Sequence, residues 1–143
     1  MKAWAMFISA YVAWGLMSAV ACAGSRSEKG GISVSLHATK DQLTVCVGAR
    51  EGWKVSSEYG VQFNADRQAA RAFSDKLPYT YRGEGTYFQI PLRIDLKTNR
   101  APRGRILNVD LGACAFDAQC QPLVFELEIP GISAETSGAP ACS

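Results

Sequence analysis

The chain has 143 residues, of which 48% are hydrophobic and 20% charged, and its formal net charge is +2. This length is typical of a single domain. The hydrophobic fraction is too high and the charge too low for a disordered protein. The near-neutral balance argues against a nucleic-acid-binding protein, which would concentrate Lys and Arg. The most informative residues are five cysteines and one histidine, and the odd cysteine count requires an explanation.

Residues 1–23 are predicted to form a secretory signal peptide. Lys2 is followed by an uncharged, mostly apolar run that ends at Val20, and then by the sequence Ala-Cys-Ala. A positive start, an apolar run and a small-x-small ending predict cleavage after Ala23. Two alternatives are less favoured. Cys22 would be lipidated in a lipoprotein, although the position three residues before it lacks the usual Leu, or the uncut run would span a membrane.

Cleavage would send 120 of the 143 residues, with four of the five cysteines, to the periplasm or the exterior. Secreted domains with an even number of cysteines usually form disulfides. Residues 24–31 are polar and rich in Gly and Ser, which predicts a flexible leader. Residues 132–143 form a small polar tail, expected to be loose unless Cys142 ties it down. The folded domain is therefore expected over residues 32–131.

Short segments that alternate between apolar and polar residues fill this domain. They are rich in β-branched and aromatic residues and are separated by Gly, Pro and Asn, a pattern typical of antiparallel strands. The expected strands are 32–36, 43–47, 53–55, 59–63, 87–96, 106–111 and 123–129. Residues 64–76 form either a short helix or a single turn packed against a sheet. The sequence therefore predicts an all-β antiparallel sandwich with at most one short helix.

Cys114 and Cys120 are expected to flank the loop between two strands. Five residues separate them, and a hairpin of that size brings the two sulfurs within bonding distance, because neighbouring strands lie about 5 Å apart. Pro122 removes a backbone donor just after Cys120, which confines this point to a sheet edge or a bulge. The pair is therefore expected at one end of the sandwich, where a partner can reach it.

Loop length distinguishes the two cysteine pairs. By the chain-entropy estimate, closing a loop of about 7 residues stabilises the fold by ~2.4 kcal/mol, and closing one of about 97 by ~4.7 kcal/mol. A disulfide between Cys46 and Cys142 would therefore suit a structural role, although Cys46 alone would also fit a buried apolar position. The short Cys114–Cys120 bridge is easier to open without unfolding, but a structural staple is the commoner fate of such pairs.

Several motifs occur in a specific order along the chain. They are Cys114-Ala-x-x-x-x-Cys120-x-Pro, the segment Glu-Gly-Trp-Lys-Val at 51–55, and Tyr-Arg-Gly at 81–83. The chain resembles the N-terminal domain of DsbD-type thiol:disulfide interchange proteins over residues 32–131. The cysteine motif is specific in its context, whereas the other segments support the resemblance through their order.

The resemblance implies an immunoglobulin-like sandwich whose cysteine pair passes electrons to periplasmic thioredoxin-like or disulfide isomerase-like proteins, an activity of the protein-disulfide reductase type. Cys120 would attack the partner's disulfide and Cys114 would resolve the mixed disulfide. Tyr81 and Gly83 would belong to a cap loop that covers the sulfurs and protects them from oxidation. The family's membrane and thioredoxin-like parts do not follow in this sequence, so a membrane electron donor is expected in trans.

Other candidate sites are weaker. His37, the single histidine, is expected on the polar face of the first strand, where solvation is favoured over a nucleophilic pair with Cys114 or Cys120. Closely spaced Cys or His ligands are missing, so neither a metal site nor a cofactor is expected. The alternative function is a non-catalytic secreted binding module in which the Cys114–Cys120 bond is structural.

Overall fold

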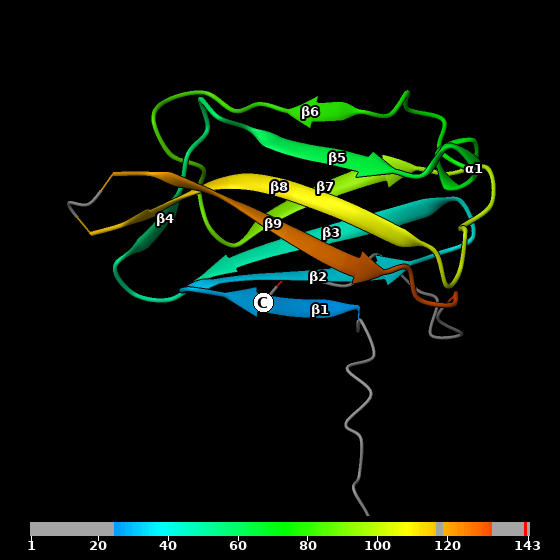
Figure 1. Ribbon diagram of the computed structural model, residues 1–143, viewed down its shortest axis with the longest axis horizontal. Coiled ribbons are helices and arrows are strands. Elements are labelled where there is room, and N and C mark those ends of the chain that lie inside the picture. The colour runs from blue at the N-terminus through cyan, green and yellow to red at the C-terminus, as the bar shows by residue number, and fades with distance from the viewer. Residues whose placement is uncertain (1–24, 117–118, 133–141, 143) are drawn as a thin grey trace, which may run out of the picture.

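The computed structural model describes residues 25–116, 119–132 and 142, and the predicted signal peptide lies outside these residues. The described residues form two antiparallel sheets packed face to face (Figure 1). This architecture confirms the predicted all-β antiparallel sandwich with one short helix. Among the described residues, no helix has the length and apolar character needed to cross a membrane.

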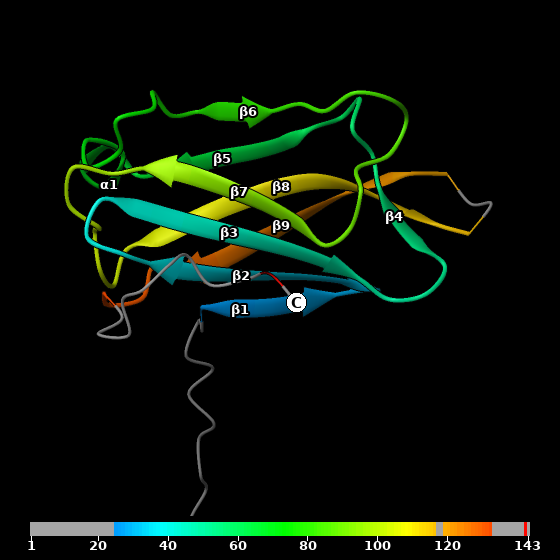
Figure 2. The same cartoon turned by 180° about the vertical axis from the view of Figure 1, so that it is seen from behind.

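The first sheet has the order β1-β2-β3-β7 and lies in front in Figure 2. Its strands are β1 (Arg26–Lys29), β2 (Ile32–Ala38), β3 (Gln42–Ala49) and β7 (Leu92–Lys97). The second sheet has the order β4-β8-β5-β6, with β9 paired to β8 as well. Its strands are β4 (Trp53–Val55), β5 (Val61–Ala65), β6 (Tyr79–Tyr81), β8 (Ile106–Ala115) and β9 (Gln121–Glu128).

The core lies between the two sheets and follows the alternation of side chains along each strand. In β8, the inward side chains of Leu107, Val109 and Leu111 are fully buried between the layers. Phe63 and Phe125 are the largest side chains that are fully buried. Burying an aromatic side chain of this kind stabilises the fold by about 1.5–3 kcal/mol. The alternation therefore fixes which residues of β8 and β9 point outward; Cys114 lies in β8, and Cys120 directly precedes β9.

The segment predicted as a flexible leader contains a strand. Residues Arg26–Lys29 form β1, which pairs with β2 in antiparallel register. A turn of two glycines connects them, and Gly30 has a φ of 57°, which glycine adopts without strain. A Cβ atom on Gly31 would lie only 2.0 Å from the Trp53 indole. The polar composition wrongly predicted a flexible leader. The segment is ordered because it pairs with β2 and because its turn packs against Trp53.

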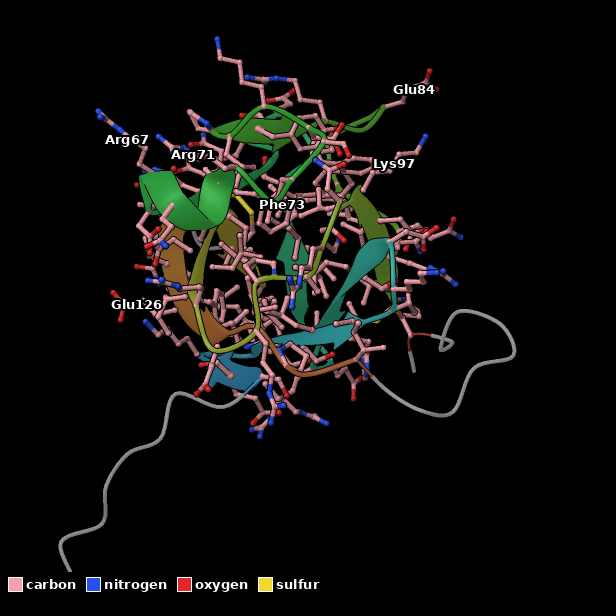
Figure 3. The ribbon with its side chains drawn as sticks, turned by 90° about the vertical axis from the view of Figure 1, so that its right-hand side faces the viewer. Arg67, Arg71, Phe73, Glu84, Lys97 and Glu126 are labelled. Atoms are coloured by element: carbon pink, nitrogen blue, oxygen red, sulfur yellow. A yellow bond between two sulfur atoms is a disulfide. The ribbon has the colours of Figure 1, made fainter. Side chains whose placement is uncertain are left out.

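The predicted helical segment 64–76 is only one turn long. Helix α1 covers Arg67–Ala70, and the Asp66 carboxylate caps it by accepting a hydrogen bond of 2.7 Å from the Ala69 N–H. Residues 64 and 65 belong to β5. Phe73 follows the turn and is buried at this end of the sandwich, whereas Arg71 points to solvent (Figure 3). Of the two alternatives, the single turn packed on the sheets is the one found.

The strands beside the cysteines are longer than the sequence predicts. β8 continues to Ala115 and therefore includes Cys114, and β9 begins at Gln121, directly after Cys120. Gly112 and Pro122 are paired with each other in the ladder. Because β9 pairs with β8 alone, a proline is tolerated on its free edge. The loop that separates the strands is correspondingly short.

Neighbouring residues of β9 test the layer arrangement. Phe125 is fully buried between the sheets, whereas Val124 points outward. Phe125→Ala is expected to lower the free energy of unfolding by about 3–5 kcal/mol, because it leaves a cavity in the core. Val124→Ala should change it by less than about 0.5 kcal/mol. Urea denaturation of both variants measures the difference, and equal effects would contradict this register.

Candidate functional site

Cys114 and Cys120 face each other across the β8–β9 ladder. The ladder pairs Gly112 with Pro122 and Ala113 with Gln121, so the two cysteines are the next opposed pair. The structure joins them in a disulfide with a Cα–Cα distance of 4.1 Å. The bond lies at the end of the sandwich away from α1 (left in Figure 1). It links the two strands directly beside the loop that connects them.

The two cysteines differ in their exposure to solvent. Cys114 is only 2% exposed, whereas Cys120 is exposed. Ala113 points into the core, so the alternation of β8 turns Cys114 toward the outer face of the sheet. A macromolecular partner therefore reaches the Cys120 sulfur more readily than the Cys114 sulfur.

Lys54 lies next to Cys114 on the side away from Cys120. β4 pairs with β8 such that Lys54 lies directly opposite Cys114. Directly opposed residues of an antiparallel pair point to the same face, with Cβ atoms about 4.5–5.5 Å apart. The Lys54 ammonium lies 4.8 Å from the centre of the Tyr87 ring. Cys120, Cys114 and Lys54 therefore form one row across three adjacent strands.

Residues 56–60 cover the outer face of the sheet beside this row. The Ser56 N–H donates a hydrogen bond of 2.9 Å to the Gly112 carbonyl. The Tyr59 hydroxyl donates one of 3.1 Å to the Asp110 carboxylate. A Cβ atom on Gly112 would lie 3.0 Å from Tyr59 Cβ, so any larger residue there would have to push Tyr59 outward. The covering segment thus packs against β8 two residues before Cys114.

The environment of Tyr59 raises its pKa above the ordinary value. Partial burial disfavours the charged phenolate, and the hydrogen bond to Asp110 and the negative charge of that carboxylate act in the same direction. The neutral phenol, which donates this hydrogen bond, is therefore the stable form at neutral pH.

The cap residues expected from the family resemblance lie elsewhere. Tyr81 belongs to β6 and pairs with Val61 of β5, so β5 separates it from β8. Its ring stacks on Phe88, with 5.8 Å between the ring centres, and both pack against the core. Gly83 also approaches Phe88, because a Cβ there would lie 2.6 Å from its ring. The structure does not bring Tyr81 or Gly83 over the cysteines.

The sequence interpretation missed Lys54 and Tyr59, which lie beside the pair. A signal for the covering segment was present in the sequence Ser-Ser-Glu-Tyr-Gly at 56–60, a turn that directly follows the third predicted strand. A second signal was Gly112, an isolated glycine within a strand, which often marks a close approach by another part of the chain.

Phe116 projects from the hairpin directly after β8. Its side chain is 76% exposed, and its φ of 45° lies in the left-handed region that phenylalanine rarely adopts. Its N–H donates a hydrogen bond of 2.7 Å to the Gly52 carbonyl. A Cβ atom on Gly52 would lie 2.3 Å from the Phe116 ring. Gly52 therefore provides the space that Phe116 occupies.

Several large apolar side chains are exposed in the described part of the chain. Within the described residues, four large hydrophobic side chains are clearly exposed: Tyr87 (41%), Phe116 (76%), Val124 (45%) and Ile132. Phe116 lies in the β8–β9 hairpin, the Tyr87 ring lies beside the Lys54 ammonium, and Val124 follows Cys120 by four residues on β9, with the exposed Pro122 between them. Clustered exposed apolar groups mark interaction sites. This surface suits contact with another protein.

The second disulfide lies on the other sheet. Cys46 is bonded to Cys142, 96 residues away in the chain, with a Cα–Cα distance of 5.4 Å. Cys46 lies in β3 between Ser35 of β2 and Arg93 of β7. A pocket of about 360 Å³ beside this bond is lined by both cysteines and His37. The histidine is thus on the opposite sheet from Cys114 and Cys120.

No group of three or more potential metal ligands occurs in the part of the chain that the structure describes. The chain matches no protein-family model, no curated protein and no solved structure. The candidate site therefore rests on the geometry of the cysteine pair and the residues around it.

The Tyr59–Asp110 hydrogen bond predicts a pH-dependent contribution to stability. Tyr59→Phe is expected to lower the free energy of unfolding by about 1 kcal/mol at pH 7. Because the pKa of Tyr59 is raised on folding, this contribution is complete below about pH 10 and is lost as the pH rises through the folded value. Urea denaturation of both proteins between neutral and strongly alkaline pH measures it. A pH-independent difference would contradict the assignment.

The contact between Gly52 and Phe116 can be tested with a matched control. Gly52 and Gly85 have φ values of 85° and 79°, but a Cβ on Gly85 would meet nothing within 4 Å. Alanine at either position should cost about 1–2 kcal/mol for the left-handed backbone. Only Gly52→Ala should also displace Phe116 and change the rate at which a small thiol reduces Cys114–Cys120. Equal reduction rates in both variants would argue against this contact.

Proposed function

We propose that this domain exchanges disulfides with other proteins through Cys114 and Cys120. The observation that carries the proposal is the asymmetry of the pair. Cys120 is exposed in a hairpin that also carries the exposed Phe116 and Pro122, and Cys114 is buried. An accessible sulfur with a shielded partner suits a reaction that proceeds through a mixed disulfide. The resemblance of the cysteine motif to DsbD-type N-terminal domains points in the same direction.

The exchange is a two-electron transfer in two substitutions. A thiolate of a reduced partner attacks the Cys120 sulfur, the Cys114–Cys120 bond breaks, and its electron pair remains on Cys114. The partner's second thiolate then attacks the mixed disulfide and releases Cys120. The partner becomes a disulfide, the pair becomes a dithiol, and the two protons of the partner's thiols end on the pair. In the reverse direction the Cys120 thiolate attacks an oxidised partner.

The hairpin can open this bond while the domain stays folded. Eight residue pairs connect β8 and β9 from Ile106–Glu128 to Ala113–Gln121, and none of them depends on the disulfide. The bond encloses a sequence separation of only 6 residues, against 96 for Cys46–Cys142. Reduction of Cys114–Cys120 therefore removes less chain-entropy stabilisation than reduction of Cys46–Cys142 would. This division supports a structural role for one bond and a chemical role for the other.

The two intramolecular disulfides indicate an oxidising compartment outside the cytoplasm. Within such a compartment, the proposed partners are periplasmic thioredoxin-like or disulfide isomerase-like proteins, and a membrane protein supplies electrons in trans. The apolar surface formed by Tyr87, Phe116, Pro122 and Val124 is the proposed contact area for these partners.

A second candidate function, a binding module without redox chemistry, uses the same apolar surface and treats Cys114–Cys120 as a staple. The reduction potential of the pair separates the two functions. A redox-active pair is expected to equilibrate with glutathione or thioredoxin buffers, between about −180 and −270 mV, whereas structural disulfides typically lie below about −300 mV. Thiol alkylation and mass spectrometry follow each pair, with Cys46–Cys142 as the internal control. A value in the structural range for Cys114–Cys120 would exclude the redox function.

Trapping tests the roles of the two cysteines. Cys114→Ala leaves the exposed Cys120 thiol without its partner, so it should form mixed disulfides that remain after purification from the periplasm. Cys120→Ala is the matched control, because its remaining thiol, Cys114, is buried. We expect at least about tenfold more adduct from the first variant. Equal trapping by both variants would contradict the assignment of Cys120 as the attacking residue.

A further inference from the structure

We propose that Lys54 stabilises the Cys114 thiolate when the disulfide is reduced, and that the Tyr87 ring holds the same ammonium group when the pair is oxidised. The proposal rests on the proposed exchange function and adds a charged residue to its site. It concerns the buried cysteine, whose sulfur becomes the leaving group in the first substitution. A cation beside a leaving thiolate favours bond breaking.

The ladder places Lys54 and Cys114 side by side. They are directly opposed in the β4–β8 pair, and both point to the outer face of the sheet. With about 5 Å between their Cβ atoms, the lysine stem is long enough for its ammonium to contact the Cys114 sulfur. Figure 1 shows β4 next to the β8–β9 hairpin at this end of the sandwich. The position is fixed by backbone pairing and does not depend on a mobile loop.

In the oxidised state the Lys54 ammonium contacts the Tyr87 ring instead of a cysteine thiolate. Both sulfurs of a disulfide are neutral, and Lys54 lies over the Tyr87 ring at 4.8 Å. Tyr87 is held there by a backbone bridge to Ser56, which follows β4 by one residue. A cation–π contact at an exposed site contributes only about 0.5–1 kcal/mol. A thiolate at Cys114 would attract the ammonium more strongly and displace it from the ring.

The other titratable groups around Cys114 are less well placed. On the described residues of the surrounding elements they include Glu51, Glu58, Tyr59, Tyr87, Asp110, Glu126, Glu128 and Lys29. Asp110 is four residues from Cys114 along β8, about 13 Å, and accepts the Tyr59 hydroxyl. Lys29 donates to the Val124 carbonyl. Of these charges, Lys54 alone is adjacent to Cys114 in the ladder.

Lys54 takes part in the first of the two substitutions. A thiolate of a dithiol protein forms a bond to the Cys120 sulfur, and the Cys114–Cys120 bond breaks. The electron pair of that bond stays on the Cys114 sulfur, where Lys54 offsets the new negative charge without giving up its proton. The second partner thiolate later displaces Cys120 and completes the oxidation of the partner.

The test compares four variants of the full mature chain. Lys54→Met removes the charge, Lys54→Arg keeps it, and Tyr87→Leu removes the ring that holds it. Lys97→Met removes one positive charge on β7, at the α1 end of the sandwich (Figure 3). The first readout is the pH dependence of iodoacetamide alkylation at Cys114 and Cys120 in the reduced proteins, followed separately by peptide mass spectrometry. The second is the equilibrium of the pair with a dithiol buffer at pH 7.

Lys54→Met is expected to raise the lower apparent pKa of the pair by about one unit. It should also shift the equilibrium toward the disulfide several-fold, whereas Lys54→Arg and Lys97→Met should resemble the unmodified protein. Tyr87→Leu should shift the equilibrium toward the dithiol by about two- to fivefold, since it removes a contact made in the oxidised state. An unchanged titration in Lys54→Met, an equal shift in Lys97→Met, or a Tyr87→Leu shift toward the disulfide would each overturn the proposal.

The same variants separate this proposal from the exchange function. If the pair exchanges disulfides with partner proteins but the Lys54→Met substitution leaves its titration unchanged, the role of Lys54 is excluded and the exchange function stands. If Lys54→Met shifts the titration but no dithiol protein exchanges with the pair, the local chemistry stands and the function is excluded.

Discussion

The register of β8 against its neighbours is the constraint on which the site depends. β8 pairs with β5 and β4 along one edge and with β9 along the other. This register opposes Cys114 to Cys120 on one side and to Lys54 on the other. A slip of one residue would turn Cys114 into the core and move the pair out of alignment. The buried residues Val109, Leu111 and Ala113 of the same strand prevent that slip.

The two disulfides act on different parts of the molecule. Cys46–Cys142 joins the outer face of β3 to a residue near the end of the chain and closes a long loop, so it restricts the unfolded chain strongly. Cys114–Cys120 links strands that backbone pairing already holds together. Breaking the second bond leaves Cys114 and Cys120 opposed, because the β8–β9 ladder still holds their strands together. An exchange reaction needs this arrangement, because the dithiol must stay aligned for the return step.

The sequence was sufficient for the fold class and for the candidate pair. Alternation in segments such as 43–47, together with the turn residues, predicts the strands, and the cysteine spacing predicts a hairpin bridge. The sequence alone did not predict which residues lie around the cysteine pair. Tyr59 meets Gly112 only because β5 folds back onto β8, a contact between positions 53 residues apart. The family resemblance predicted Tyr81 in a cap over the sulfurs, but Tyr81 pairs with Val61 in β6 and packs against the core.

Phe116 combines an unfavourable backbone conformation with an exposed apolar side chain. A non-glycine residue in the left-handed region costs about 1–2 kcal/mol, and a side chain that is 76% exposed recovers little of this by burial. Most other large apolar side chains of the domain are instead buried between the two sheets. Among the described residues, the Phe116 N–H donates a hydrogen bond to the Gly52 carbonyl, and its ring lies against Gly52. A partner that buries the Phe116 ring beside Cys120 would supply the missing stabilisation, and it would do so only when docked at the exposed sulfur.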